Sequence, residues 1–410
     1  MNTRKSVLNA AVVMGALVAF AGLPAGVARA GTGINVPCSG PGGGAAGLVA
    51  AINAANAAGG GAISLAPGCT YTLAAAGSSG QLGPNGLPIV TTRITIAGAH
   101  ATITRSSSQQ FRILEVDGPG GNLSLNGLTI TGGDAKQPGG GVFNDAGTLT
   151  LNASAVTGNK TEADAGGILN RAGTAVLNAS RVSGNTSDSG GGIASGPGSD
   201  TAPVTGSSLI LNGSRVDHNT AAEGAPEAEG GGIANGGTAV LRGSSVDHNS
   251  APGGTGAGIL NHGTMTITGS QITGNTAPAD RAGNDGNVGG IVNVNFGIPP
   301  SGGSGVLTMN GSTVSGNSAS GFAGGLGNAP DSTATITGSS VSGNSTDGAG
   351  GGVVNQGELA MTGSRVLDNT AAAGGGIANQ GGTVTLTGTR VAGNTPDNCE
   401  PPGTIAGCTG

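Results

Sequence analysis

The chain has 410 residues, of which 87 are glycine, while 36% are hydrophobic and only 9% are charged. One glycine in about five is too few for a collagen triplet, and a chain with this much apolar character and so little charge does not resemble a disordered one. With one Tyr, five Phe and no Trp, the chain also lacks the bulk of an ordinary globular core, so the composition favours a short structural repeat.

The N-terminus has the pattern of an export signal. Two basic residues, Arg4 and Lys5, precede an apolar run over 7–23, and Ala28-Arg29-Ala30 matches a signal-peptidase site. We therefore predict a signal peptide over 1–30 and a secreted, extracellular protein without a later membrane span. The alternative is an uncleaved anchor, because the apolar run is just long enough to cross a bilayer.

The charge of the mature chain argues against a nucleic-acid partner. Three of the 15 Lys and Arg lie within 1–30, which leaves 12 cations against 21 Asp and Glu, a net charge of −9. A basic surface of the kind that contacts phosphates is therefore not expected.

An N-terminal cap and the first coils are predicted over 31–120. Leu48 and Ile52 have helical spacing within the segment 45–58, which indicates an amphipathic helix. The following segment 61–73 contains the first strands. A helix at this place would cover the open end of a stack of repeats.

A repeat extends over 121–395, and its clearest copy is GGGIANQGGTVTLTGTRVAGNT at 374–395. Within each unit apolar residues alternate with polar ones, which is the period of a strand with one buried face. Each unit therefore contains three short strands separated by Gly or Asn corners, where left-handed backbone conformations cost little. No helix-length segment returns the chain, so successive units stack in parallel.

These features predict an all-β fold, a right-handed parallel β-helix of about 12 coils with a short N-terminal capping helix. The right hand follows from the rule for parallel crossovers. The Asn residues that recur at the corners are expected to stack in ladders and to bond the corner backbone.

The four cysteines, Cys38, Cys69, Cys399 and Cys408, lie near the two ends of the mature chain and allow three pairings. We predict Cys38–Cys69 and Cys399–Cys408, because both ends of a solenoid need closing. The second pair belongs to a C-terminal cap over 396–410. Metal binding is the rival interpretation, but no CxxC spacing or neighbouring His supports it.

Two stretches of the sequence resemble known families. The segments LVAAINAAN and ISLAPGCTYTL resemble the N-terminal cap and first coil of secreted bacterial proteins of the pectin-lyase-like superfamily. The GGIxN elements resemble the middle-domain repeats of chlamydial polymorphic outer-membrane proteins, and the NTPDNC…GC tail resembles exported actinobacterial β-helix repeat proteins. The resemblance implies the fold but leaves the function open, because the superfamily includes lyases, hydrolases and adhesins.

Few residues suggest chemistry. Asp145 and Arg171 are 26 residues apart, and we expect a cross-coil ion pair between them. His262 is expected to be exposed. The motif Val-Asp-His-Asn occurs twice, and stacked coils would bring together Asp217, His218, Asp247 and His248. Stacked carboxylates repel, so a shared cation is one hypothesis, and solvent-facing substitutions in two repeat copies are the other.

A second candidate cation site lies at the edge that follows the closing Asn of each unit. The edge carries ten of the 21 acidic residues, and the denser groups coincide with inserts around 222–229 and 277–288. The calcium ligands proposed there are Glu223, Glu227, Glu229, Asp280 and Asp285. Surface loops that tolerate insertion are the alternative. No cofactor is expected apart from this possible calcium ion.

The sequence favours a secreted, non-enzymatic protein that acts as a structural, adhesive or ligand-binding surface. A monomer is expected, with an extracellular polysaccharide or cell-surface glycan as its partner. The alternative is a polysaccharide lyase or glycoside hydrolase of the pectin-lyase-like superfamily. We favour the first because neither a carboxylate cluster nor an aromatic platform for sugars is evident.

Overall fold

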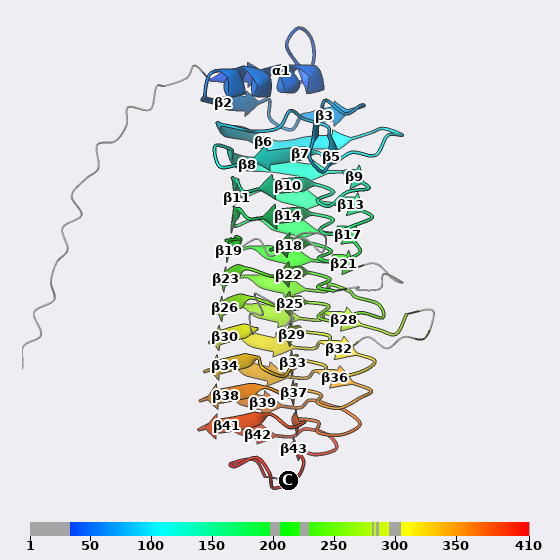
Figure 1. Ribbon diagram of the computed structural model, residues 1–410, viewed down its shortest axis with the longest axis vertical. Helices are drawn as coiled ribbons and strands as arrows, with labels where there is room; N and C mark the ends of the chain where they lie inside the picture. Colours follow the sequence, from blue (N-terminus) through cyan, green and yellow to red (C-terminus); the bar gives the residue numbers. More distant parts are fainter. Residues whose placement is uncertain are drawn as a thin grey trace, which may run out of the picture. The chain divides into compact units, whose positions relative to one another are not determined.

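The chain winds into a right-handed parallel β-helix in a computed structural model that describes residues 33–196, 206–221, 229–280, 283, 287–294 and 305–409 (Figure 1). The signal peptide predicted over 1–30 lies outside the described residues. None of the helices in the described part of the chain is long and apolar enough to cross a membrane.

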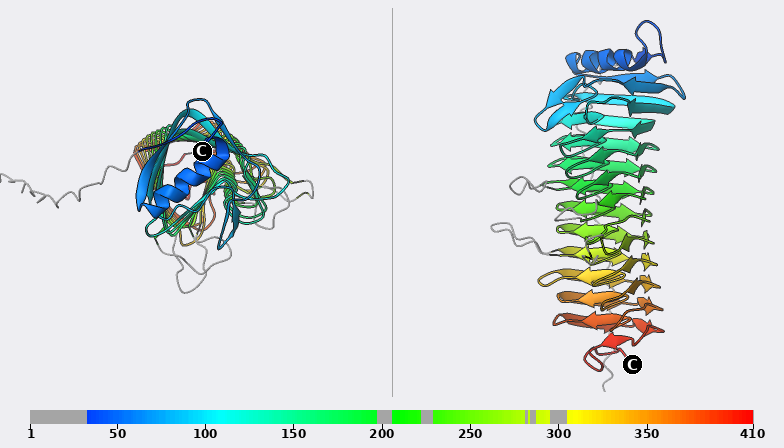
Figure 2. Two further views of the ribbon diagram at one scale, coloured as in Figure 1. Left: turned by 90° about the horizontal axis from the view of Figure 1, so that it is seen from above. Right: turned by 90° about the vertical axis from the view of Figure 1, so that its right-hand side faces the viewer.

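The N-terminal end is closed by the predicted helix, α1 (Gly44–Ala57), which lies across the first coil (Figure 2). Its Leu48 and Ile52 are buried against the core. The strand β1 (Ile34–Val36) adds a further layer by pairing in parallel with β2 (Gly60–Leu65). The disulfide Cys38–Cys69, as predicted, joins this cap to the first coil.

Each regular coil has three faces, and the coil at 168–187 shows them in order. The first face is β14 (Ile168–Arg171), the second is β15 (Thr174–Asn178) and the third is β16 (Arg181–Ser183). On the second and third faces inward residues are buried and outward residues are partly or fully exposed, as period two requires. A fourth strand of two residues, β17 (Thr186–Ser187), was not predicted, because two residues are too short to show any period.

The first face forms an 11-stranded parallel sheet that begins at β7 and to which each later coil contributes one strand. Besides β14, its members are β7 (Leu114–Asp117), β10 (Val142–Asp145), β18 (Ile193–Ser195), β22 (Ile233–Asn235), β25 (Ile259–Asn261), β29 (Ile291–Asn293), β33 (Leu326–Asn328), β37 (Val353–Asn355), β40 (Ile377–Asn379) and β43 (Cys399–Glu400).

The second and third faces share one 23-stranded sheet, because β6 (Arg93–Arg105) and β8 (Asn122–Thr131) run through both of them. The second face adds β11 (Thr148–Asn152), β19 (Ser208–Asn212), β23 (Thr238–Arg242), β26 (Thr264–Thr268), β30 (Val306–Asn310), β34 (Thr333–Thr337), β38 (Glu358–Thr362) and β41 (Thr383–Thr387). The third face adds β3 (Thr70–Leu73), β12 (Ala155–Thr157), β20 (Arg215–Asp217), β24 (Ser245–Asp247), β27 (Gln271–Thr273), β31 (Thr313–Ser315), β35 (Ser340–Ser342), β39 (Arg365–Leu367) and β42 (Arg390–Ala392).

The remaining strands are short and lie outside these faces. The fourth edge, on which β17 lies, also has β9 (Asp134–Ala135), β13 (Lys160–Thr161), β21 (Thr220–Ala221), β28 (Thr276–Ala277), β32 (Ser318–Ala319) and β36 (Ser345–Thr346). Near the N-terminal end, β4 (Ser78–Gly80) and β5 (Gly83–Asn85) form an antiparallel hairpin.

Asparagine ladders satisfy the corner backbone inside the stack, as predicted. The Asn249 Nδ2 donates both to the carbonyl of Val216 and to Oδ1 of Asn275, while its own Oδ1 accepts from the Asn219 amide. A second ladder runs beside the first face, for example from Asn235 Nδ2 to Asn261 Oδ1. Buried polar groups with partners in the next coil fix the stacking register.

The C-terminal end is closed by the segment after β42. Cys399 and Cys408 form the predicted disulfide, and Ile405 is buried against the last coil.

Candidate active site on the third face

Two histidines mark the corner between the third face and the fourth edge, in the middle of the stack. His218 and His248 both have φ of 54°, in the left-handed region. In five other coils this corner is glycine with φ of 61° to 63°, namely Gly158, Gly184, Gly274, Gly316 and Gly343. A side chain there costs roughly 1 kcal/mol relative to glycine, so the two imidazoles occupy positions that the repeat itself reserves for glycine.

The first histidine belongs to a group that spans two coils. Arg181 lies on β16, and Asp217 lies on β20 in the next coil, where it pairs in register with Ser183. The guanidinium reaches diagonally across: Arg181 Nε donates to Asp217 Oδ1 at 2.8 Å, and Nη2 donates to Oδ2. This two-pronged geometry is the strongest form of a carboxylate–guanidinium pair.

The same arrangement repeats one coil further. Arg215 on β20 reaches Asp247 on β24 through Nη2, and its Nε lies 3.5 Å from Oδ2 of Asp217. One guanidinium therefore lies between the two carboxylates, which removes the repulsion expected for stacked acids. The side chains of Asp217 and Asp247 are 0% and 7% exposed, whereas those of Arg181 and Arg215 are about half exposed.

Each aspartate also holds the histidine that follows it. His218 Nδ1 lies 2.8 Å from Asp217 Oδ2, and His248 Nδ1 lies 3.0 Å from Asp247 Oδ2. An ionised carboxylate only accepts hydrogen bonds, so Nδ1 carries the proton and the lone pair of the neutral ring is on Nε2. The two rings stack with centroids 5.4 Å apart and planes within 8°.

Folding lowers the pKa of Asp217 to about 2. Burial of the carboxyl raises the pKa, but hydrogen bonds from Arg181 and His218 and the charges of Arg181 and Arg215 outweigh that effect. Asp217 is therefore ionised at every pH at which the protein would normally work, and it serves to hold its neighbours rather than to donate a proton.

An Asp217→Asn variant should lose stability at neutral pH but not in acid. Because folding lowers this pKa from 3.8, the carboxylate stabilises the fold above pH 3.8, and that stabilisation is lost as the pH falls toward 2. We expect a deficit on the order of 1–2 kcal/mol at pH 7 that disappears near pH 2, measured by urea unfolding at several pH values. Asp347→Asn, which changes an exposed acid of the fourth edge, should leave the curves unchanged.

The group could remove a proton from a bound anion. Both Nε2 atoms belong to side chains that are nearly 60% exposed. Neither Arg181 nor Arg215 uses its Nη1 in a hydrogen bond to the described residues, so each guanidinium keeps a donor for a ligand. An exposed imidazole base oriented by a carboxylate, beside a guanidinium, is suited to deprotonating carbon next to a carboxylate.

The structure brings together Asp217, His218, Asp247 and His248, as the repeated motif predicted, but their environment differs from the prediction. The aspartates are buried rather than solvent-facing, and the cations that they bind are guanidinium groups. Arg181 and Arg215 were not predicted as part of the site. Their signal is present in the sequence, since each stands at the outward position two residues before the outward Ser183 or Asp217 of the same strand.

The acidic edge gathers no comparable site among the described residues. Glu223, Glu227 and Asp285 lie outside them, and Glu229 is 3.7 Å from His262 Nε2. Asp280 is described and lies beside Gly253. In the part of the chain that the structure describes, no three His, Cys, Asp or Glu side chains are grouped to hold a metal ion. The calcium site remains a prediction.

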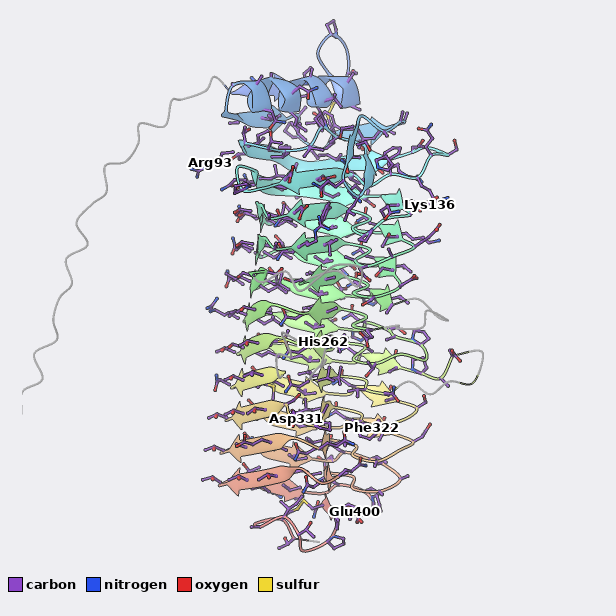
Figure 3. All side chains as sticks on the ribbon, in the orientation of Figure 1. Arg93, Lys136, His262, Phe322, Asp331 and Glu400 are labelled. Carbon is purple, nitrogen blue, oxygen red and sulfur yellow. A yellow bond between two sulfur atoms is a disulfide. The ribbon has the colours of Figure 1, made fainter. Side chains whose placement is uncertain are left out.

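Two smaller expectations have clear outcomes. The cross-coil pair is present: Arg171 Nε and Nη2 donate to the two oxygens of Asp145 at 3.0 and 2.6 Å. His262, which lies midway along the stack (Figure 3), was expected to be exposed, but its side chain is only 20% exposed. Its neighbour Glu229 comes from the preceding coil, which the sequence alone did not show.

Solved structures with a similar fold are polysaccharide-acting enzymes. They include the pectate lyase Pel9A, with 14% identity, a TM-score of 0.42, and coverage of 89% of this chain and 80% of the other. The A-modules of the Azotobacter vinelandii mannuronan C-5 epimerases AlgE4 and AlgE6 follow, with 15% and 14% identity, TM-scores of 0.35 and 0.30, and coverage of 89% of this chain and 93% and 94% of theirs. The predicted parallel β-helix is confirmed by the strand pairing of the chain itself.

Against the expectation that the chain is not an enzyme, all three of these structures are enzymes. An adhesive role has no support from them. No protein-family model and no curated protein matches the sequence.

Proposed function

We propose that the chain is an exported lyase that acts on a polysaccharide containing uronic acids, with the His218–Asp217 and His248–Asp247 pairs as its proton-abstracting groups. The observation that carries the proposal is the position of two aspartate-bound imidazoles beside Arg181 and Arg215 on adjacent coils. Export is supported by the predicted signal over 1–30 and by two disulfides, which form in oxidising compartments.

In the proposed reaction a free guanidinium Nη1 binds the carboxylate of a uronate residue. Pairing the carboxylate stabilises the negative charge that develops when the neighbouring C5 loses its proton. A histidine Nε2 takes that proton, the electron pair forms a C4–C5 double bond, and the C4–O bond to the next sugar breaks. The imidazolium then returns the proton to the leaving oxygen, so no further reactant is needed.

The geometry fits elimination better than hydrolysis. A glycoside hydrolase needs one carboxylic acid that is protonated and a second carboxylate about 5 to 9.5 Å away across the sugar. Asp217 and Asp247 cannot supply that pair, because each is buried beneath an arginine and a histidine, and the pKa of Asp217 is held at about 2. The exposed groups that a substrate would meet are imidazoles and guanidiniums.

The test is an absorbance assay for the unsaturated product near 235 nm, over a panel of polygalacturonate, polymannuronate, polyguluronate and glucuronate-containing polymers. Release of reducing ends is measured in parallel. An increase in both signals on at least one polyuronate is expected. New reducing ends without absorbance would indicate hydrolysis and contradict the proposal, as would no turnover on any polymer.

A further inference from the structure

A hollow of about 470 Å³ lies beside the fourth edge, between the β4–β5 hairpin and β9. Its volume falls in the range of natural ligand pockets. The walls combine apolar and polar side chains, namely Leu82, Pro84, Gln110, Arg112, Lys136 and Gln137.

Arg112 makes the wall of the hollow rigid. Its side chain is 0% exposed and lies over the ring of Phe143 at 5.1 Å. Nη1 donates to Asn85 Oδ1 and Glu115 Oε2 at 3.1 and 3.0 Å, and Nη2 donates to the carbonyls of Leu82 and Pro138. One buried guanidinium thus ties the hairpin to the coil below it. A preformed hollow avoids the entropy cost of ordering its walls around a ligand.

The lining of the hollow contains one exposed cation, Lys136, and no acid, although the edge around it is acidic. Of three lysines in the chain, Lys5 lies in the predicted signal and Lys160 lies on β13 of this edge. The third, Lys136, lines the hollow (Figure 3). Arg105 pairs with Asp134 at 3.1 Å, and Glu162 accepts from Gln110 at 3.1 Å. With Asp164 of the same edge, three cations stand here against three acids, but the residues that line the hollow include Lys136 and no acid.

The hollow lies along the stack from the histidines. Strand pairing leads from β8 through β12 and β16 to β20, so the coil of β8 and β9, whose Ala135 lines the hollow, is three coils from that of His218. At the spacing of paired strands, three coils correspond to about 14 Å. A polymer that follows the corner of the stack would reach both places.

We propose that this hollow binds one acidic sugar of the same polyuronate chain several residues away from the bond that is cleaved. The Lys136 ammonium meets the sugar carboxylate, and the Gln137 amide, which can donate and accept, meets its hydroxyls. Gln110 can only accept from a hydroxyl through Oε1, because its Nε2 already donates to Asp134 and Glu162. This inference rests on the proposed function for the identity of the polymer, but binding at the hollow needs no catalysis.

The test uses the double variant Lys136→Ala/Gln137→Ala, both positions being exposed. Binding of a long oligouronate is measured calorimetrically in the His218→Gly/His248→Gly background, so that the ligand survives. We expect the affinity to fall about tenfold. When the double variant is made in the protein that keeps both histidines, KM for the polymer should rise about tenfold with kcat unchanged. A uronate trimer should be cleaved as fast as by the parent, because it is too short to reach the hollow.

Arg390→Ala is the matched control, because it removes one exposed cation from the last coil, and it should change neither quantity. If the double variant binds the oligouronate as tightly as its parent, the hollow is not a subsite, even if the enzyme turns over. Binding that depends on Lys136 and Gln137 without turnover on any polyuronate would contradict the proposed function and support the hollow.

Discussion

Replacing both His218 and His248 by glycine is expected to abolish turnover while leaving the protein as stable as before or more so. Removal of a positioned general base typically lowers kcat by about 10²–10⁴-fold. The fold should not suffer, because both residues have φ of 54° at a corner that is glycine in neighbouring coils. Glycine adopts the left-handed backbone without strain, which stabilises the variant by up to about 1 kcal/mol. This gain offsets the loss of the two hydrogen bonds between the histidines and their aspartates.

The measurements are kcat and KM on the preferred polyuronate and Tm by calorimetry. Asp368→Gly is the matched control, because Asp368 occupies the same corner four coils further along with φ of 55°. It should affect Tm in the same direction and leave kcat unchanged. A double variant that keeps more than about a tenth of the wild-type kcat would show that the imidazoles are not the proton acceptors.

The single variants separate the two histidines. His218 is held by an aspartate that two guanidiniums approach, whereas among the described residues the aspartate beside His248 pairs with one guanidinium, that of Arg215. If one imidazole takes the proton and the other only binds, one glycine variant should lose kcat and the other should raise KM. Equal partial losses in kcat would mean that the substrate uses both coils.

Replacing Arg112 by methionine should destabilise the protein by about 3–5 kcal/mol at pH 7. The variant leaves the Glu115 carboxylate buried without its cation and takes the donors away from the carbonyls of Leu82 and Pro138. Burial already raises the pKa of Glu115, against hydrogen bonds from Asn85 and Arg112 that lower it. Without the guanidinium, the carboxyl should become protonated on folding.

That proton gives the variant a characteristic pH dependence. Folding of the variant then raises the pKa of Glu115 above its unfolded value near 4.5. The variant is therefore most stable below pH 4.5, where the carboxyl is protonated in both states, and it loses stability as the pH increases. The deficit relative to wild type should therefore shrink at pH 4, and Arg112→Met/Glu115→Gln should recover part of it at pH 7. Unfolding in urea at the two pH values measures both effects.

Arg171→Met is the matched control, because Arg171 also lies 5.1 Å from the ring of Phe143 and pairs with an acid of another coil. Its partner Asp145 is 17% exposed, so solvent compensates for the loss of the arginine, and we expect a cost of about 1 kcal/mol. Equal costs for the two arginine variants would show that burial of Glu115 is not the reason for the larger effect.

Much of the architecture was predictable because a solenoid repeats the same local chemistry. Alternation such as Val384 and Leu386 in the second face, glycine at corners, and a recurring Asn at the end of each unit define a coil without knowledge of the other coils. The disulfides at both ends followed from the need to close the stack. The fourth strand was missed because β17 and its equivalents are only two residues long.

The candidate site was predictable only in part. Repetition of Val-Asp-His-Asn placed Asp217 beside Asp247, but the role of these residues depends on Arg181 and Arg215, which are 36 and 32 residues before their partners. Those separations reflect inserts of different lengths in the intervening coils, so no constant period indicates them. The Arg112–Glu115 pair lies in the first coils, where the repeat is irregular, and it went unnoticed.

By itself the sequence determined that the chain coils, where each coil turns and which residues point inward, since these depend on period, glycine and asparagine within single units. Only the tertiary structure decided which charges meet and how far water is excluded from them. Within a single coil, an aspartate that points outward would be solvated. In the stack, Arg181 of the preceding coil and the neighbouring His218 cover Asp217, whose side chain is 0% exposed. Charge, protonation and reactivity are set by such neighbours across coils, and those neighbours exist only once the stack has formed.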